Sequence, residues 1–183
     1  MSSLRVPLDL IPLAMQSLAS GLKTTMSLVV EELGKTVNEL GSSSGIGNAV
    51  DLELLKGIRR NADVVLTSGA TFRADQYKFP KTSDLAVLST RQPVMQVPQN
   101  KRLTWIKSDY VKALSDLESA GYHRIHVEYG MTGMNSLKSA SYPIVLFISS
   151  VTSQGVDRFL EEQRMTGLKI ELPGLFLAVV AWQ

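Results

Sequence analysis

Two segments of this 183-residue sequence combine small, hydroxyl and charged residues in an order that suits ligand binding. In the first, the apolar run 64–66 leads into small or hydroxyl residues: Thr67, Ser68, Gly69 and Thr71. Arg73 and Asp75 follow with opposite charges. Ligands of open α/β sheets bind just beyond the carboxyl ends of the strands, where glycine lets them approach the backbone closely. This segment is therefore a candidate binding site.

The second segment, residues 125–137, joins a short apolar run to a glycine-containing turn. Glu128 ends the run, and Gly130 and Gly133 bracket the expected start of a helix. Unpaired N–H groups and the dipole at a helix N-terminus bind phosphate, and glycine lets the anion reach them. The turn is a candidate pyrophosphate cradle, with a Gly-x-x-Gly signal that is less specific than the Gly-x-Gly-x-x-Gly fingerprint.

Apolar periodicity predicts the elements that position these segments. The runs expected to form strands are 24–30, 64–66, 85–88, 103–106, 125–127 and 144–148. Asn48 or Asp51 is expected to cap a helix. The apolar face of that helix is formed by Leu52, Leu55 and Ile58.

A second helix is expected to begin after Ser108 or Asp109 and to stop at Gly121. Strands alternating with helices of this length favour an α/β domain with a largely parallel sheet. The end of the chain differs, because residues 168–172 and 175–181 flank a Pro-Gly pair and predict an antiparallel hairpin.

Length favours one domain over residues 1–183. Residues 1–22 are expected to form an irregular N-terminal segment in which Pro12 starts a short helix. The Gly/Ser-rich stretch 41–45 has the length of a surface loop, so it requires no domain boundary.

Composition excludes several classes of protein. The chain has no cysteine, which excludes disulfides, thiolate zinc sites and iron–sulfur clusters. Only His123 and His126 could supply imidazole, so no metal site is expected. The 19 basic and 17 acidic side chains form no basic stripe, so nucleic acid is not an expected partner. Residues 170–182 are too short to span a bilayer, and a soluble cytoplasmic protein is expected.

Some of these residues also have structural interpretations without a ligand. Gly69 and Gly130 could be turn residues that need a positive φ. Asp75 could be a helix N-cap or a solvated turn residue.

Glu128 could pair with Arg124 or Lys138 at the surface, where an ion pair contributes little. His123 and His126 flank a strand without an acidic ligand pair at i, i+2 spacing on the same face. They are expected to be surface or packed residues rather than catalysts.

Taken in this order, the two segments resemble the reductase domain of riboflavin biosynthesis, a family with a dihydrofolate-reductase-like fold. In that family a strand precedes Gly/Ser-Ala/Gly-Thr-Val-x-Ala-Asp-Asp-Pro, and residues 67–75 read Thr-Ser-Gly-Ala-Thr-Phe-Arg-Ala-Asp. Its later signature, Val-Glu-Gly-Gly-Pro-Thr-Leu-x-x-x-Leu, is similar to Val-Glu-Tyr-Gly-Met-Thr-Gly-Met-Asn-Ser-Leu at residues 127–137. The resemblance covers residues 24–137. It implies a three-layer domain with a mixed, mostly parallel central sheet.

The resemblance implies an NADPH-dependent reduction of a ribosylaminopyrimidine 5′-phosphate to its ribitylamino form. Hydride would pass from the nicotinamide to the sugar C1 as the ribose ring opens. The cofactor would be lined by Ser68, Gly69 and Thr71. Its phosphates would be held by Gly130, Met131 and Thr132. Asp75 would face the substrate as the acidic catalytic group, with Glu128 nearby and Arg73 on the substrate phosphate.

The sequence departs from the family pattern at several positions. The family's Ala-Asp-Asp-Pro is replaced by Ala-Asp-Gln-Tyr at residues 74–77. Tyr129 stands where the family has a glycine, so a bulky ring is expected where the cofactor approaches. These changes keep a second function open, that of a catalytically eroded member of the fold that binds a nucleotide or metabolite without turnover.

Residues 175–182 are too apolar for a free sheet edge, and a homodimer is expected, as the resemblance also implies. The length leaves no room for the zinc-dependent deaminase domain that often precedes this reductase. The expected protein is therefore a stand-alone reductase for a phosphorylated pyrimidine or a related heterocycle.

Overall fold

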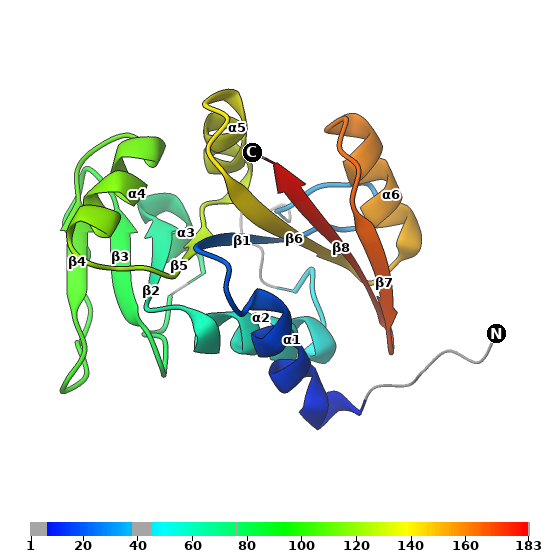
Figure 1. The fold of residues 1–183 in the computed structure, drawn as a ribbon, viewed down its shortest axis with the longest axis horizontal. Coiled ribbons are helices and arrows are strands. Elements are labelled where there is room, and N and C mark those ends of the chain that lie inside the picture. Colours follow the sequence, from blue (N-terminus) through cyan, green and yellow to red (C-terminus); the bar gives the residue numbers. More distant parts are fainter. Residues whose placement is uncertain (1–6, 38–44, 76, 183) are drawn as a thin grey trace.

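The computed structural model describes residues 7–37, 45–75 and 77–182, and one sheet forms its centre (Figure 1). In these residues eight strands follow the order β4-β3-β2-β5-β1-β6-β8-β7. Their bounds are β1 Thr24–Val29, β2 Val64–Ser68, β3 Asp84–Leu88, β4 Leu103–Ile106, β5 Ile125–Glu128, β6 Ile144–Ser150, β7 Leu168–Leu172 and β8 Leu175–Trp182. Strands β1 to β6 run parallel to one another, and β8 runs antiparallel to β6 and β7. The predicted mixed, mostly parallel sheet with a C-terminal hairpin is confirmed.

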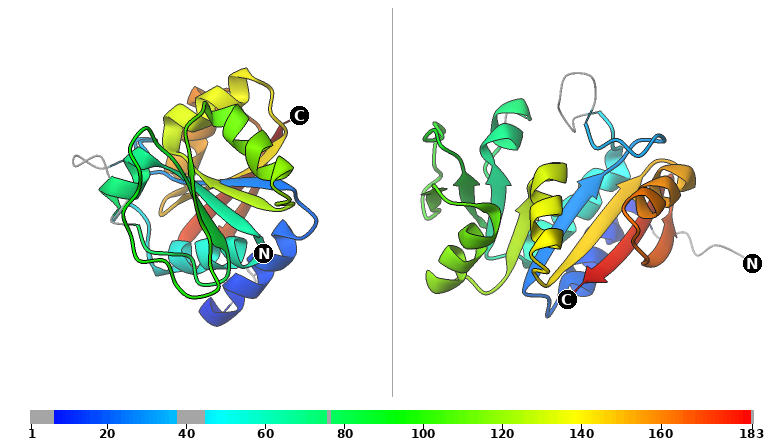
Figure 2. Two further views of the ribbon diagram at one scale, coloured as in Figure 1. Left: turned by 90° about the vertical axis from the view of Figure 1, so that its left-hand side faces the viewer. Right: turned by 90° about the horizontal axis from the view of Figure 1, so that it is seen from above.

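Helices cover both faces of this sheet and complete three layers (Figures 1 and 2). The helices are η1 Leu8–Leu10, α1 Ile11–Ala19, α2 Ala49–Asn61, α3 Gly69–Ala74, α4 Tyr110–Ser119, α5 Gly130–Ser139 and α6 Ser153–Glu162. Helices α4, α5 and α6 lie on one face, and α1 and α2 lie on the other. Within the described part of the chain, no helix is long and apolar enough to cross a membrane.

The two faces of the sheet differ in how their cores are built. The α4–α6 face carries one continuous cluster in which Met26, Leu66 and Val127 pack under α4 and α5. The opposite face has two apolar clusters, one around Phe147 beneath α1 and α2, and one around Val65. Between these two clusters lie the polar residues of β5 and β1, which form part of the candidate site.

Every expected strand is present, but parts of the helical prediction were wrong. The short helix expected from Pro12 is present as α1, which buries Ile11 and Met15, but residues 8–10 are also helical rather than irregular. In α2, Leu52 is half exposed, and the buried positions are Leu54, Gly57, Ile58 and Asn61. The buried stripe is displaced because α2 packs against α1 as well as the sheet. Helices α3 and α6 were not expected, and most of the predicted loop at 41–45 lies outside the described residues.

Strand β8 of the hairpin lies inside the sheet, and β7 forms the edge. Strand β8 is bonded to β6 on one side and to β7 on the other. Its apolar side chains are buried within this chain: Leu175, Leu177, Ala178 and Val180. The argument that these residues need a second subunit to cover them is therefore wrong, because β6, β7 and the helices already do so.

Gly57 allows the backbones of α1 and α2 to approach closely. A Cβ at this position would lie 2.5 Å from the Pro12 carbonyl oxygen and 2.7 Å from the Met15 Cβ. Gly57→Ala should therefore lower the free energy of unfolding by about 1–3 kcal/mol, although alanine is the better helix former. Urea unfolding measures this, with the exposed neighbour Lys56→Ala as control. A Gly57→Ala protein as stable as wild type would contradict the close packing.

Candidate functional site

Strands β2 and β5 are parallel neighbours, so the two segments selected from the sequence meet. Their register runs from Val64 opposite Ile125 to Thr67 opposite Glu128. The Thr67 hydroxyl donates a hydrogen bond to the Glu128 carbonyl oxygen at 3.1 Å. From β2 the chain continues to β3 on one side, and from β5 it continues to β6 on the other. Such a reversal opens a crevice at the carboxyl ends of the strands, where ligands of α/β sheets bind.

A cavity of about 560 Å³, here called the cationic cleft, lies at this edge of the sheet. The lining residues include Ser68, Gly69, Arg73, Ser89, Lys107 and Tyr110. Both charged residues of the lining are cations, Arg73 and Lys107. The Lys107 ammonium also lies 4.3 Å from the centre of the Trp105 ring, a cation–π contact. The cleft therefore suits an anionic group.

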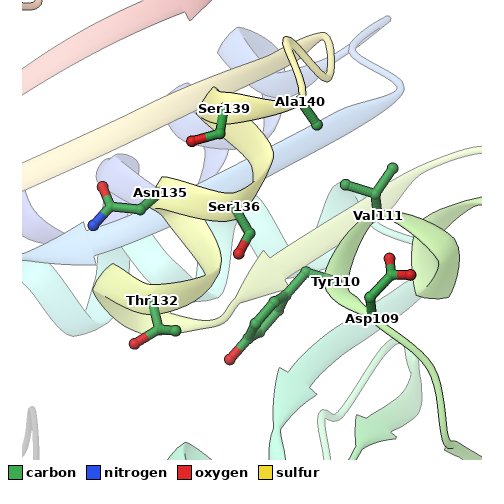
Figure 3. A pocket seen from close by; sticks show the side chains of 8 residues that line it. All are labelled: Asp109, Tyr110, Val111, Thr132, Asn135, Ser136, Ser139 and Ala140. Carbon is green, nitrogen blue, oxygen red and sulfur yellow. The ribbon is translucent and has the colours of Figure 1, made fainter.

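A second cavity, of about 710 Å³, lies between α4 and α5 and is here called the α4–α5 groove (Figure 3). The lining residues are Asp109, Tyr110, Val111, Thr132, Asn135, Ser136, Ser139 and Ala140. Hydroxyl and amide groups of α5 dominate this lining, so the groove offers hydrogen bonds rather than cationic charge. Tyr110 lines both cavities, so they are neighbours, and together they are here called the trough.

The predicted cofactor residues are divided between the two cavities. Ser68 and Gly69 line the cationic cleft, and Thr132 lines the groove. The Ser68 hydroxyl caps α3, because it accepts a hydrogen bond from the Thr71 N–H and contacts the Thr71 hydroxyl at 3.0 Å. Met131 packs against the core of the α4–α6 face. Ser68, Gly69 and Thr132 are therefore the predicted cofactor residues with direct access to the trough.

The two glycines of the prediction have different structural reasons. Gly130 has a φ of +70°, and a Cβ there would meet open space. Gly69 is not in the positive-φ region, so a turn does not explain it. A Cβ on Gly69 would lie 2.4 Å from the Ser89 hydroxyl, so the glycine lets the ends of β2 and β3 come together.

Tyr129 does not stand in the trough, contrary to the expectation from the sequence. It is 3% exposed, and its ring packs edge-on against Tyr110 with ring centres 4.8 Å apart. A Cβ on Gly133 would collide with the Tyr129 side chain, so Gly133 makes room for the buried ring. Within the described part of the chain, no side chain caps the start of α5.

The residues predicted to face the substrate lie on and after α3. Arg73 is exposed and lines the cationic cleft. Asp75 is the C-cap residue of α3, and its N–H donates to the Thr71 carbonyl oxygen at 3.0 Å. The N-cap interpretation of Asp75 was therefore wrong, and its proposed contact with substrate stays a prediction.

Glu128 takes part in a compact polar cluster beneath the trough. Arg59 of α2 donates to both carboxylate oxygens, from Nε at 2.7 Å and from Nη2 at 2.8 Å. The Tyr77 hydroxyl donates to Oε2 at 2.6 Å and accepts from Arg59 Nη2 at 2.9 Å. The expected surface pairing of Glu128 was wrong, since Arg124 pairs with Asp63 and the Glu128 side chain is only 11% exposed.

His126 extends this cluster into the interior of the sheet. Its ring is fully buried, with Nδ1 at 2.9 Å from the Thr25 hydroxyl and Nε2 at 3.1 Å from the Ser27 hydroxyl. Nε2 also lies 3.5 Å from the Glu128 carboxylate, which is two residues along the same strand face. The sequence interpretation overlooked this acidic neighbour. Among the described residues, no group of three or more His, Asp or Glu side chains could hold a metal ion.

The charges of the cluster follow from its contacts. Burial alone would raise the pKa of Glu128, but the charge and hydrogen bonds of Arg59 lower it to about 2. Burial lowers the pKa of His126 to about 4, although the Glu128 charge acts in the opposite direction. Burial and the Glu128 charge raise the pKa of Tyr77 well above its usual value. At neutral pH the cluster thus holds an arginine–carboxylate pair, a neutral imidazole and a neutral phenol.

Sequence reasoning missed Lys107, Ser89 and Tyr110 in the cleft, and Arg59 and Tyr77 in the cluster. Ser89 and Lys107 directly follow the predicted strands 85–88 and 103–106. Because ligands of α/β sheets bind beyond the carboxyl ends of strands, these two residues could have been predicted. No comparable signal pointed to Arg59, because its contact with Glu128 joins residues 69 positions apart.

Comparison with known proteins supports the fold through structure rather than sequence. No family model and no curated protein matches this chain. A pyrimidine reductase-like protein from Corynebacterium diphtheriae is 14% identical, with a TM-score of 0.63 over 92% of this chain and 98% of that one. A Thermotoga maritima diaminohydroxyphosphoribosylaminopyrimidine deaminase/5-amino-6-(5-phosphoribosylamino)uracil reductase is 13% identical, with a TM-score of 0.60 over 87% of this chain and 56% of that one.

A Schistosoma mansoni dihydrofolate reductase is 15% identical, with a TM-score of 0.54 over 89% of this chain and 98% of that one. These likenesses extend over most of this chain. The chain therefore has the dihydrofolate-reductase-like fold that the riboflavin-pathway reductases share.

The buried imidazole predicts a pH dependence of stability. Because the pKa of His126 is lowered from 6.5 to about 4 by folding, the unfolded chain takes up a proton first as the pH falls. The neutral imidazole makes its full contribution to the free energy of unfolding above pH 6.5. Between pH 6.5 and 4 this contribution, about 3 kcal/mol, is lost. His126→Gln should show a correspondingly flatter decline in urea unfolding across this range. Parallel declines in wild type and variant would contradict a neutral, buried imidazole.

Proposed function

We propose that this protein is a cytoplasmic, single-domain NADPH-dependent reductase of a phosphorylated pyrimidine or a related heterocycle. The observation that carries the proposal is the trough of two neighbouring cavities, one with cations beyond the ends of β2, β3 and β4 and one with hydrogen-bonding groups between α4 and α5. NADPH carries an additional phosphate on one of its two nucleoside halves, and this unequal charge matches cavities of which one is cationic.

The residues of the trough fit NADPH. The uncapped start of α5 at Gly130, Met131 and Thr132 offers N–H groups to phosphate, with open space beside Gly130. Ser68, Gly69 and Thr71 would border the cofactor at the start of α3. Lys107 can pair with the additional phosphate that distinguishes NADPH from NADH, because a carboxylate-free cationic lining favours the more highly charged ligand.

When bound, the cofactor would supply the hydride for the reduction. The protein would bind and orient the substrate beside it. Arg73 would contact the substrate phosphate, and the Asp75 carboxylate would face the substrate at the end of α3. Glu128 would lie near the substrate, but its carboxylate is already hydrogen-bonded to Arg59 and Tyr77 and is not a free carboxylate.

One observation favours the second function, binding without turnover. The Glu128 carboxylate already accepts three hydrogen bonds from Arg59 and Tyr77, so little of its bonding capacity remains for a substrate. In this alternative the trough binds a nucleotide, and no reaction takes place at the residues predicted to face the substrate.

Ligand binding tests the proposal directly. NADPH at 100 times its dissociation constant should add about 2.7 kcal/mol to the stability of wild type, seen as a raised melting temperature. Lys107→Gln should weaken NADPH binding about tenfold and NADH binding less, since one charge-assisted bond is lost. Lys112→Gln is the matched control, because Lys112 is exposed on α4 and pairs with Asp116.

The outcomes separate the two functions. No stabilisation by NADPH would refute the reductase proposal. Stabilisation without substrate-dependent loss of nicotinamide absorbance, tested with ribosylaminopyrimidine phosphates, would favour binding without turnover.

We also propose that the protein forms a homodimer. With the β8 side chains buried, the support comes from the exposed edge strand β7, where Leu168 is 63% exposed. Light scattering should give twice the mass of one chain, and a monomer at micromolar concentration would contradict the proposal.

A further inference from the structure

The cluster of Arg59, Tyr77 and Glu128 connects the two ligand-facing segments without lining either cavity. Arg59 comes from α2, Glu128 is the last residue of β5, and Tyr77 lies beyond the end of α3. Glu128 directly precedes the turn that opens α5, and the segment before Tyr77 carries Arg73 and Asp75. One set of side-chain contacts therefore fixes both sides of the crevice relative to each other.

We propose that Tyr77 is a positioning residue whose hydrogen bonds to Glu128 and Arg59 hold α3 as a wall of the cationic cleft. The inference rests on the proposed function only in naming NADPH as the ligand of that cleft.

The contacts at Tyr77 form a closed arrangement. Its hydroxyl donates to one Glu128 oxygen and accepts from Arg59, while Arg59 also bonds both oxygens of Glu128. The Arg59 guanidinium lies 5.3 Å from the centre of the Tyr77 ring. Because the acceptor is a carboxylate, the phenol bond is charge-assisted and stronger than a neutral one.

Tyr77 in turn is attached to α3 by its ring and its backbone. The ring stacks on Phe72 with centres 6.2 Å apart, and the Tyr77 N–H donates to the Phe72 carbonyl oxygen at 3.1 Å. Phe72 lies within α3, one residue before Arg73 and three after Gly69, both of which line the cleft. A displacement of Tyr77 is therefore transmitted to the wall of the cleft over a single turn of helix.

Local contacts also hold α3. Its start is capped by the Ser68 hydroxyl, and Phe72 and Tyr77 pack against the small cluster around Val65 and Leu85. A helix of six residues has little stability of its own, so contacts beyond its ends determine its position. The Tyr77 hydroxyl adds a contact that reaches across to Glu128 of β5.

Tyr77→Phe is the sharpest test, because it removes only the hydroxyl and keeps the ring on Phe72. Amide hydrogen exchange of residues 69–75 should become about tenfold faster, since one charge-assisted hydrogen bond is lost. Exchange in β2 and β3 should stay at the wild-type rate, which separates local opening from global unfolding. The KM for NADPH should rise while kcat at saturating NADPH stays within about twofold of wild type.

Tyr122→Phe is the matched control. Its hydroxyl also bonds a carboxylate, Asp84 Oδ2 at 2.9 Å, but at the opposite edge of the sheet. This variant should leave both the exchange of residues 69–75 and the KM for NADPH unchanged.

Unchanged exchange of α3 in Tyr77→Phe would overturn the proposal. Faster exchange with an unchanged KM would also overturn it, since the cluster would then brace the fold without shaping the cleft. If wild type binds no NADPH, the proposed function fails. The exchange comparison then decides alone whether Tyr77 holds α3.

Discussion

Strand β5 hydrogen-bonds to β2 on one side and to β1 on the other, and most features of the site depend on this placement. It brings Thr67 beside Glu128, although 61 positions separate them in the chain. Because β2 and β5 are parallel and the strand order reverses between them, the starts of α3 and α5 open on the same edge of the sheet. The cationic cleft and the α4–α5 groove both border that edge and share Tyr110.

The same placement puts polar residues into the middle of the sheet, where they need partners. His126 and Glu128 lie on the α1–α2 face between two apolar clusters. An unpaired carboxylate there would be costly to bury, and the bidentate bond from Arg59 offsets that cost. Thr25 and Ser27 provide the corresponding partners for the imidazole. The cluster thus gives hydrogen-bond partners to the polar side chains of β5. It also fixes the segment that follows α3.

The sequence predicted the strands well because buried parallel strands are continuous apolar runs, as at 64–66 and 144–148. It could not predict the partner of Glu128, because that contact depends on which strands become neighbours. The short helix α3 has too few residues to show a helical period. The sequence does hold a signal for α6, since Thr152 caps it and Val156, Phe159 and Leu160 follow helical spacing. Tyr129 was misjudged because its neighbour Gly133 makes room for the ring in the core.

We propose that the ends of β2 and β5 form one nucleotide site. Hydrogen exchange of wild type with and without NADPH tests it most directly. Bound ligand should protect amides at the start of α3, at Gly69–Ala74, and at the start of α5 in Gly130–Ser139, in the same titration. Protection of only one of these helix starts, or of neither, would contradict a single site built by the two strand ends.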